Sequence, residues 1–273
     1  MNIWHLPERF DTGDGLVAWN RLGSGSPVVL LHGSPFSSYV WREVAAALAE
    51  RHQVFVWDLL GHGQSEQRDG QDVSLDAQHR ILAALLDEWG LRRPAVVAHD
   101  FGGSVALRVT LLSGRPYRRL VLLDAAAVGP WGSSFLRLAR ENPAVFSALP
   151  GHLHEAVVRR QIATASHLGM PEAEIDEHVR PWLAATGQAA YYRQIAQADQ
   201  RHTDEIEPRY SELDIPVLVG WGEQDTWLPV DRGERLAAAI PGARWKLFSN
   251  SGHLVMRDAP AQVGAAVADF LQR

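Results

Sequence analysis

The sequence contains no cysteine among its 273 residues, and this absence removes several kinds of chemistry. Without thiols the chain can form no disulfide framework, no thiolate nucleophile and no thiolate metal site. The sequence also lacks any stretch close to the roughly 18 uninterrupted apolar residues that a membrane-spanning helix needs. No membrane partner is therefore expected, and we also expect no metal and no other cofactor.

Positive charge is in the minority as well. The chain has 26 Lys and Arg residues against 32 Asp and Glu residues, which gives a formal net charge of −6. This balance argues against nucleic acid as a natural partner. The first residues lack a basic segment followed by an apolar one, so no secretory signal is visible and a cytoplasmic location is expected. The sequence leaves the oligomeric state open.

Short β-branched runs alternate with longer helical patterns, and this alternation is typical of a parallel sheet with crossover helices. Residues 15–22 are expected to add an antiparallel edge strand. The predicted parallel strands are 27–31, 53–59, 95–99, 120–123, 216–221 and 244–248. The predicted helices of this core are 41–51, 74–89, 103–113, 231–239 and 259–272.

Residues 129–210 interrupt the alternation, because only helical patterns follow the Gly-Pro-Trp-Gly stretch at 129–132. Pro171 and Pro181 are expected to mark helix boundaries there. The strand pattern resumes at Ile215. We therefore predict a first core segment over 1–128, an inserted helical cap over 129–210 and a second core segment over 211–273.

Asp100 is the most informative residue of the chain, in the stretch Pro-Ala-Val-Val-Ala-His-Asp-Phe-Gly-Gly at 94–103. An apolar run that stops at a polar residue among small residues is typical of a sharp strand-to-helix turn, which presents one side chain as a nucleophile. A carboxylate in that place is suited to displacing a leaving group from an sp³ carbon, and water then cleaves the resulting ester. On this stretch alone Asp100 could also be a simple turn residue. Ser34 and Ser104 are weaker candidates, because neither stands at the tip of the turn.

A carboxylate nucleophile needs a general base and an acid that orients it. His253 follows the last predicted strand, where a neutral imidazole can take a proton from water. Asp225 follows the preceding strand and can reach the same sheet edge. Asp124, which also ends a strand, is the alternative orienting acid.

Cleavage of the ester also requires two backbone N–H groups that hold the oxyanion. Phe101, the residue after the nucleophile, is the first expected donor. The second is expected in the loop after an early strand, His-Gly-Ser-Pro at 32–35. We assign it to Ser34, since Pro35 has no N–H to donate.

Taken together, these motifs resemble the α/β-hydrolase superfamily over essentially the whole chain. The matching patterns are the His-Gly-x-Pro loop at 32–35, the Asp-x-x-Gly-x-Gly-x-Ser loop at 58–65, the His-Asp-x-Gly-Gly elbow at 99–103, the Gly-x-x-Asp acid at 222–225 and the Gly-His base at 252–253. The order nucleophile, acid, histidine also matches. The resemblance implies an α/β-hydrolase fold, a mostly parallel central sheet flanked by helices, with an inserted helical cap.

The aspartate at the elbow makes the chain similar to the branch that contains epoxide hydrolases, haloalkane dehalogenases and haloacetate dehalogenases. Haloalkane dehalogenases usually place a Trp after the nucleophile and an Asn or Trp elsewhere as halide donors, whereas this chain has Phe101 and Ser34. Haloacetate dehalogenases carry an Arg after the nucleophile. Epoxide hydrolases need mainly the backbone N–H of that residue, together with cap tyrosines that donate to the epoxide oxygen.

The predicted cap contains Tyr191 and Tyr192, in a Tyr-Tyr-Arg stretch that resembles an epoxide-hydrolase cap motif. Adjacent helical residues point about 100° apart, so at most one of them is expected to face the site, and the motif position favours Tyr192. A pair of core-packing aromatic residues is the plainer interpretation, and no further tyrosine lies within 129–209. Trp131 and Trp182 could instead donate indole N–H groups to a halide, and His32 is expected beside the substrate.

The resemblance therefore implies hydrolysis of a small apolar epoxide to a diol, with water as the second substrate. Dehalogenation of a haloalkane or haloacid is the first alternative, and hydrolysis of an ester or lactone is the second. A ligand-binding protein without turnover is the remote alternative. The intact triad argues against it, because a binder would not need Asp225 and His253 paired.

Overall fold

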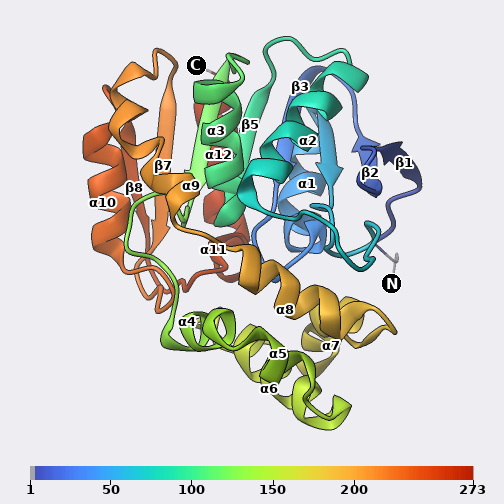
Figure 1. Cartoon of the computed structure of the whole chain (residues 1–273). Helices are drawn as coiled ribbons and strands as arrows, with labels where there is room; N and C mark the ends of the chain where they lie inside the picture. The colour runs from blue at the N-terminus through green and yellow to red at the C-terminus, as the bar shows by residue number, and fades with distance from the viewer. Residues whose placement is uncertain (1–3, 273) are drawn as a thin grey trace.

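The computed structural model describes residues 4–272, which form an eight-stranded sheet with helices around it (Figure 1). The strand order is β1-β2-β4-β3-β5-β6-β7-β8. β2 pairs antiparallel with both β1 and β4, and every other neighbouring pair is parallel. The strands are β1 (Glu8–Asp11), β2 (Leu16–Leu22), β3 (Ser26–Leu31), β4 (His52–Trp57), β5 (Ala95–His99), β6 (Arg119–Leu123), β7 (Val217–Gly222) and β8 (Arg244–Phe248).

This sheet confirms the predicted fold class. The strand predicted over 15–22 is antiparallel as expected, but it is not the edge, because β1 pairs with its outer side. The bounds of β5 and β8 agree with the predicted ranges 95–99 and 244–248. β1 was not predicted from the sequence, because its four residues are mostly exposed and carry no apolar alternation.

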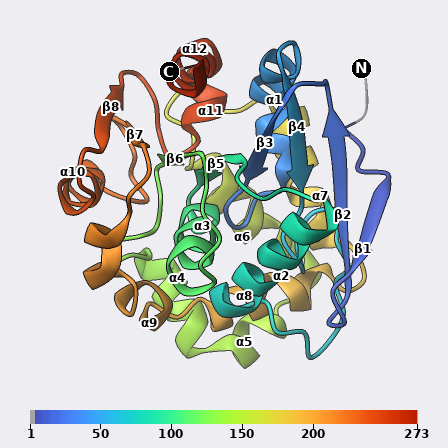
Figure 2. The same cartoon turned by 90° about the horizontal axis from the view of Figure 1, so that it is seen from above.

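Helices cover both faces of the sheet, as the view from above shows (Figure 2). α1 (Arg42–Ala49) and α12 (Pro260–Gln272) pack on one face, and α2 (Leu75–Glu88) and α3 (Phe101–Leu112) pack on the other. The remaining core helices are η1 (Ser38–Trp41), α10 (Val230–Ala239) and α11 (Val255–Asp258).

The central strands are apolar on both sides because each side packs against helices. In β3, Val28 and Leu30 belong to the apolar cluster that contains α1 and α12, whereas Val29 and Leu31 belong to the cluster that contains α2 and α3. Successive side chains of a strand point to opposite faces, so one strand contributes to both cores. The rigid sheet that results fixes the positions of the loops at its ends.

Between β6 and β7 the described chain forms helices and loops only. Five of these helices lie together beyond one end of the sheet (Figure 1), and we call them the inserted helices. They are α4 (Ser134–Glu141), α5 (Pro143–Ser147), α6 (Gly151–Ala163), α7 (Glu172–Leu183) and α8 (Gly187–Gln197). The short α9 (Arg201–Asp204) and η2 (Glu207–Glu212) then lead back to β7.

The two prolines of this region behave differently from each other. Pro171 directly precedes α7, as predicted, but Pro181 lies inside α7 and does not mark its boundary. A proline removes the hydrogen bond that its own N–H would donate, and α7 ends two residues later at Leu183. Across residues 4–272, no helix is long and apolar enough to cross a membrane.

Candidate active site

Asp100 lies between β5 and α3, in a backbone conformation that few residues other than glycine adopt. Its φ is 50° and its ψ is −122°, so the chain turns sharply from strand to helix at this residue. Two glycines make room for the turn. A Cβ on Gly33 would collide with the Asp100 side chain, and one on Gly102 would lie 2.6 Å from the carbonyl oxygen of His32. The strained turn therefore presents the Asp100 carboxyl beside the loop that follows β3.

Two backbone N–H groups hold this carboxyl. The N–H of Ser34 donates to Oδ2 of Asp100 at 2.9 Å, and the N–H of Phe101 also donates to the carboxyl. Burial raises the pKa of Asp100, whereas His253 and these two hydrogen bonds act in the opposite direction. These are the two N–H groups predicted from the sequence as oxyanion donors, a role that stays a prediction.

His253 stands between two carboxyl groups. Its Nδ1 lies 2.9 Å from Oδ2 of Asp225, and its Nε2 lies 3.8 Å from Oδ1 of Asp100. Burial acts to lower the pKa of His253, but the charges of Asp225 and Asp100 prevail and raise it. The ring also stacks on Trp227, with the ring centroids 4.9 Å apart. Its Nε2 has no hydrogen-bond partner and is free to accept a proton from water.

Asp225 is itself held by the backbone, which fixes its direction. Its Oδ1 accepts hydrogen bonds from the N–H groups of Trp227 at 2.7 Å and Leu228 at 3.0 Å. Asp124, the alternative orienting acid, accepts a hydrogen bond at Oδ1 from the N–H of Gly222 at 2.7 Å. Of the two acids, Asp225 is therefore the one that is hydrogen-bonded to the imidazole.

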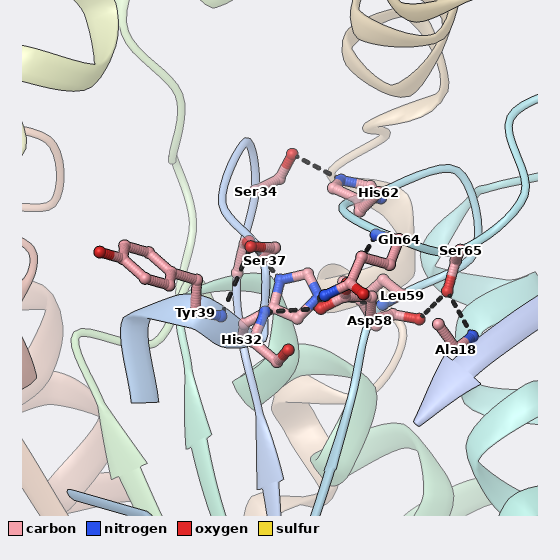
Figure 3. A network of polar contacts seen from close by, with 12 residues as sticks. Ala18, His32, Ser34, Ser37, Tyr39, Asp58, Leu59, His62, Gln64 and Ser65 are labelled. Carbon is pink, nitrogen blue, oxygen red and sulfur yellow. Dashed lines mark hydrogen bonds and ion pairs between the residues drawn. The ribbon is translucent and has the colours of Figure 1, made fainter. Parts of the chain in front are cut away.

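The loop that carries Ser34 is held by a network of buried polar contacts (Figure 3). Oδ1 of Asp58 accepts from the N–H of Ser38 at 2.7 Å, and Oδ2 accepts from the N–H of Gln64 at 2.7 Å. Nε2 of His62 lies 3.0 Å from Oγ of Ser34. The loop at 58–65 thus supports the loop after β3 that carries Ser34.

His32 belongs to this network, and the expectation that it contacts substrate is wrong. It is completely buried, its Nε2 accepts from the N–H of Leu59 at 2.9 Å, and its Nδ1 lies 2.8 Å from the carbonyl oxygen of Gly33. Burial lowers the pKa of His32 to about 4, so the ring is neutral. Both of its nitrogens are used to shape the loop.

A cavity opens above Asp100, between the sheet edge and the inserted helices. The empty space that its lining encloses is about 530 Å³, a figure that includes open solvent at the mouth. No Lys or Arg is among the described residues that line it. The lining residues of the sheet-edge loops are Ser34, Pro35, Asp100, Phe101, Ala126, Trp227, Leu228 and His253. Those from the inserted helices and the segment leading to them are Trp131, Gly132, Ser133, Leu136, Gln161, Tyr191, Gln194 and Ile195.

The two cap tyrosines exchange the roles expected for them. Tyr191 lines the cavity, whereas the hydroxyl of Tyr192 lies 3.1 Å from Nδ1 of His154, within the inserted helices. Of the two tryptophans, Trp131 lines the cavity, but its Nε1 donates to Oγ1 of Thr203 at 2.8 Å. Of the two tyrosines it is therefore Tyr191, and not the favoured Tyr192, that lines the cavity.

Trp182 is also turned away from the cavity. Its Nε1 donates to the carbonyl oxygen of Pro35 at 2.8 Å, and this hydrogen bond connects α7 to the loop after β3. The expectation that Trp182 contacts substrate is wrong for this reason. In the described chain no group of three or more His, Cys, Asp and Glu side chains is placed to hold a metal ion.

Sequence reasoning missed two amides of the inserted helices, Gln161 and Gln194, which line the cavity. Oγ of Ser34 donates to Oε1 of Gln194 at 2.6 Å, so α8 is linked to the loop after β3 that carries Ser34. No local motif marks either glutamine. The helical spacing of Tyr191, Gln194 and Ile195, which places them along one side of α8, could have pointed to Gln194 but not to Gln161 of α6.

Comparison with known proteins gives a family match over most of the chain. The model of the alpha/beta hydrolase fold family matches residues 26–260. An uncharacterized protein of Mycobacterium tuberculosis is 31% identical, over 93% of this chain and 77% of that protein. A 2-hydroxy-6-oxononadienedioate/2-hydroxy-6-oxononatrienedioate hydrolase of Paraburkholderia xenovorans is 28% identical, over 96% of this chain and 93% of that protein. Haloalkane dehalogenase 2 of Mycobacterium tuberculosis is 26% identical, over 95% and 93%.

Solved structures agree with this match. An alpha/beta hydrolase fold protein from Burkholderia ambifaria is 44% identical, with a TM-score of 0.95 over 97% of this chain and 98% of that one. The epoxide hydrolase CorEH is 24% identical, with a TM-score of 0.83 over 97% and 98%. At that identity the second likeness shows the shared fold alone.

Proposed function

This chain belongs to the alpha/beta hydrolase fold family, and from that premise we propose that it opens small uncharged epoxides to diols with Asp100 as the nucleophile. One observation carries the proposal. The Asp100 carboxyl has Oδ2 held by the N–H of Ser34 at 2.9 Å, while Oδ1 faces His253 and the cavity. Such a carboxylate has one oxygen prepared to attack and the other already in an oxyanion hole.

In the first step, Oδ1 of Asp100 attacks an epoxide carbon. The carbon–oxygen bond breaks, and its electron pair goes to the epoxide oxygen, which takes a proton from the hydroxyl of Tyr191. Burial raises the pKa of Tyr191, so the hydroxyl holds its proton in the resting enzyme, while the developing alkoxide is basic enough to accept it. The product is a hydroxyalkyl ester of Asp100, and Tyr191 is left as a phenolate.

In the second step, His253 takes a proton from water, and the hydroxide attacks Cγ of Asp100. The negative charge collects on Oδ2, which the N–H of Ser34 already binds, and the N–H of Phe101 also donates to this carboxyl. The intermediate collapses, and the departing diol oxygen takes the proton from His253. Asp100 is released as a carboxylic acid and returns its proton to Tyr191, so the protons balance.

Esterification also prepares the base for this step. The negative charge of Asp100 contributes to the raised pKa of His253. Once Asp100 is an ester that charge is gone, and the pKa of His253 falls toward the neutral form that a general base needs.

The lining of the cavity supports an uncharged substrate. One curated relative is named for a dienedioate, which carries two carboxylates, and no Lys or Arg lines this cavity in the described chain to pair with them. The same lack argues against a haloacid. Phe101, next to the nucleophile, presents an aromatic ring with no donor.

Dehalogenation is the second candidate, and Gln194 favours it. Since Ser34 binds the carbonyl end of the Gln194 amide, its NH₂ group remains available to a leaving halide in the cavity. A relative at 26% identity is named a haloalkane dehalogenase. Epoxide opening remains the better-supported proposal, because Tyr191 can donate a proton that a halide does not require.

A trapping experiment tests the mechanism. His253→Gln should open the epoxide but not cleave the ester, so incubation with styrene oxide should add the mass of the substrate to the peptide that holds Asp100. A single turnover of the unaltered enzyme in water labelled with heavy oxygen should place the label in that same carboxyl. Asp100 without added mass in the variant and without label in the enzyme would exclude the ester mechanism.

The substrate is tested separately. The enzyme is offered styrene oxide and bromobutane in parallel, with diol and bromide as the two readouts. Diol formation without bromide release supports epoxide opening, whereas bromide release alone identifies a dehalogenase with the same nucleophile. Tyr192→Phe serves as the matched control for Tyr191→Phe in both assays.

A further inference from the structure

Trp227 is an aromatic residue in contact with His253, and the proposed mechanism gives it no role. It lies two residues after Asp225, in the loop that follows β7. Its ring stacks on the imidazole of His253, with the ring centroids 4.9 Å apart and an angle of 23° between the two planes. Nearly parallel rings at this distance form an offset stack, in which one ring face lies against the other. The general base is therefore in contact with the π-electrons of a tryptophan.

Three contacts fix the indole of Trp227 in this position. Its backbone N–H donates to Oδ1 of Asp225 at 2.7 Å, so its main chain is attached to the acid that orients the imidazole. Its Nε1 donates to Oγ1 of Thr164, the C-cap residue of α6, at 3.0 Å. Phe36 also stacks on the indole, with the ring centroids 5.9 Å apart. Both the sheet edge and the inserted helices thus determine how the ring lies against His253.

The face of an indole attracts positive charge, because its π-electrons give that face a negative potential. A cation within about 6 Å of the ring centroid is stabilised by this attraction, and tryptophan is the most effective of the aromatic residues. The attraction is larger when the cation is removed from water, and the imidazole of His253 is buried. Since a neutral imidazole gains no such stabilisation, the contact favours the protonated form of His253.

We propose that Trp227 is a positioning residue whose indole face stabilises the protonated form of His253. The consequence for catalysis rests on the proposed function. In that mechanism His253 takes a proton from water and holds it until the departing diol oxygen removes it. The indole lowers the free energy of this protonated state and acts on the reaction only through the imidazole.

Among the described residues, the titratable groups that face His253 are two carboxyls, one histidine and one tyrosine. Burial acts to lower the pKa of His253, but the charges of Asp225 after β7 and Asp100 after β5 raise it overall. His99 of β5 packs on the imidazole with the ring centroids 4.7 Å apart, and burial keeps the pKa of His99 well below its ordinary value. Burial raises the pKa of Tyr191, which lines the cavity from α8. None of these neighbours is a cation that would oppose the effect of the indole.

Two substitutions at position 227 test the effect of the ring face. Trp227→Phe keeps an aromatic face and Trp227→Leu does not, whereas both lose the hydrogen bond to Thr164 and both keep the backbone N–H that binds Asp225. The pKa of His253 is measured in the resting protein by nuclear magnetic resonance of its ring, with His253→Gln used to assign the signal. We expect this pKa to fall by about one unit in Trp227→Leu and to stay nearer the wild-type value in Trp227→Phe.

The direction of the change distinguishes the proposal from a purely structural role. If Trp227 only shielded the imidazole from water, its removal would raise the pKa of His253, because burial lowers that pKa. Thr164→Val is the matched control, since it removes the hydrogen bond to Nε1 and keeps the indole, and its pKa should agree with the wild-type value. A raised pKa in Trp227→Leu, equal values in Trp227→Leu and Trp227→Phe, or an equal fall in Thr164→Val would overturn the inference.

A fluorinated tryptophan at position 227 provides a second test that keeps the hydrogen bond and nearly the same shape. Fluorine withdraws electrons from the ring face, so the pKa of His253 should fall, and an unchanged value would contradict the proposal. In rapid-mixing experiments, hydrolysis of the alkyl-enzyme should be about tenfold slower in Trp227→Leu, and Trp227→Phe should recover most of that rate.

The titrations need no substrate, so they separate this inference from the proposed function. A lowered pKa of His253 in Trp227→Leu, together with no alkyl-enzyme in the trapping experiment, would support the inference and exclude the proposed mechanism. A trapped ester on Asp100, together with the same pKa of His253 in every variant, would support the mechanism and overturn the inference.

Discussion

The sheet edge and the inserted helices border the same cavity, but their residues are held in different ways. At the sheet edge the backbone holds the reactive groups, since N–H groups fix the carboxyls of Asp100 and Asp225. In the inserted helices side chains hold one another, as Tyr192 and His154 do. From this difference we infer that the strand ends determine the type of reaction, whereas side-chain packing in the inserted helices determines which substrates can enter the cavity.

The largest effect is expected from a substitution at the sheet edge that does not alter the inserted helices. Asp225→Asn removes the charge that orients His253 and stabilises its protonated form. We expect the alkyl-enzyme to hydrolyse about 10⁴-fold more slowly, by analogy with the acid of a serine triad. Rapid mixing with mass spectrometry should show the ester accumulating on Asp100. A rate near that of the wild type would mean that another acid orients the imidazole.

The second prediction compares two neighbouring tyrosines of the inserted helices, one expected to affect activity and the other stability. Tyr191→Phe should lower kcat/KM for an epoxide about 10²-fold, because the ring would open without a proton donor. Tyr192→Phe should leave kcat/KM close to that of the wild type and cost about 1 kcal/mol of stability, since it loses only the contact with His154. Steady-state kinetics and urea unfolding of both variants measure this. Equal losses of activity would contradict the contrast.

A third prediction concerns the stability of the inserted helices in acid. His178 of α7 is buried between Phe36 and Tyr39, with each pair of ring centroids 5.2 Å apart. Neither of its ring nitrogens has a hydrogen-bond partner. Burial lowers the pKa of His178 from 6.5 to about 4. Glu174 acts to raise this pKa, whereas Arg42 and Arg257 act to lower it further.

The sign follows from the depressed pKa of His178. As the pH falls below 6.5 the unfolded chain takes up the proton first, so folding stability is lost between pH 6.5 and about 4. At about pH 5 this one residue accounts for roughly 2 kcal/mol. His178→Phe should therefore narrow the gap between urea midpoints measured at neutral and acid pH. An unchanged gap would show that the ring is protonated in the folded state.

The smallest expected effect concerns the pH dependence of activity that His253 causes at the sheet edge. Burial acts to lower the pKa of His253, and the charges of Asp225 and Asp100 raise it overall. Activity should therefore fall as the pH drops through this pKa. Esterification removes only the charge of Asp100, so the acid limb of kcat should lie below that of kcat/KM. Coincident limbs would show that Asp100 does not influence the base.

What could be predicted from the sequence follows the same division. The strands and the loops after them were predictable, because buried parallel strands are continuous apolar runs and the residues after them meet at one edge. The role of His32 was predicted wrongly, because both of its ring nitrogens contact backbone groups of the surrounding loops and not the cavity. The choice between Tyr191 and Tyr192 depended on how α8 packs, which helical periodicity does not contain.

Ser34 has a consequence that reaches beyond its role as a donor. Its N–H binds the nucleophile, while its hydroxyl binds Gln194 of α8 and lies beside His62. A displacement of α8 that admits substrate must either break this hydroxyl contact or pull on the loop after β3. The position of α8 is therefore linked through Ser34 to the loop that holds the Asp100 carboxyl.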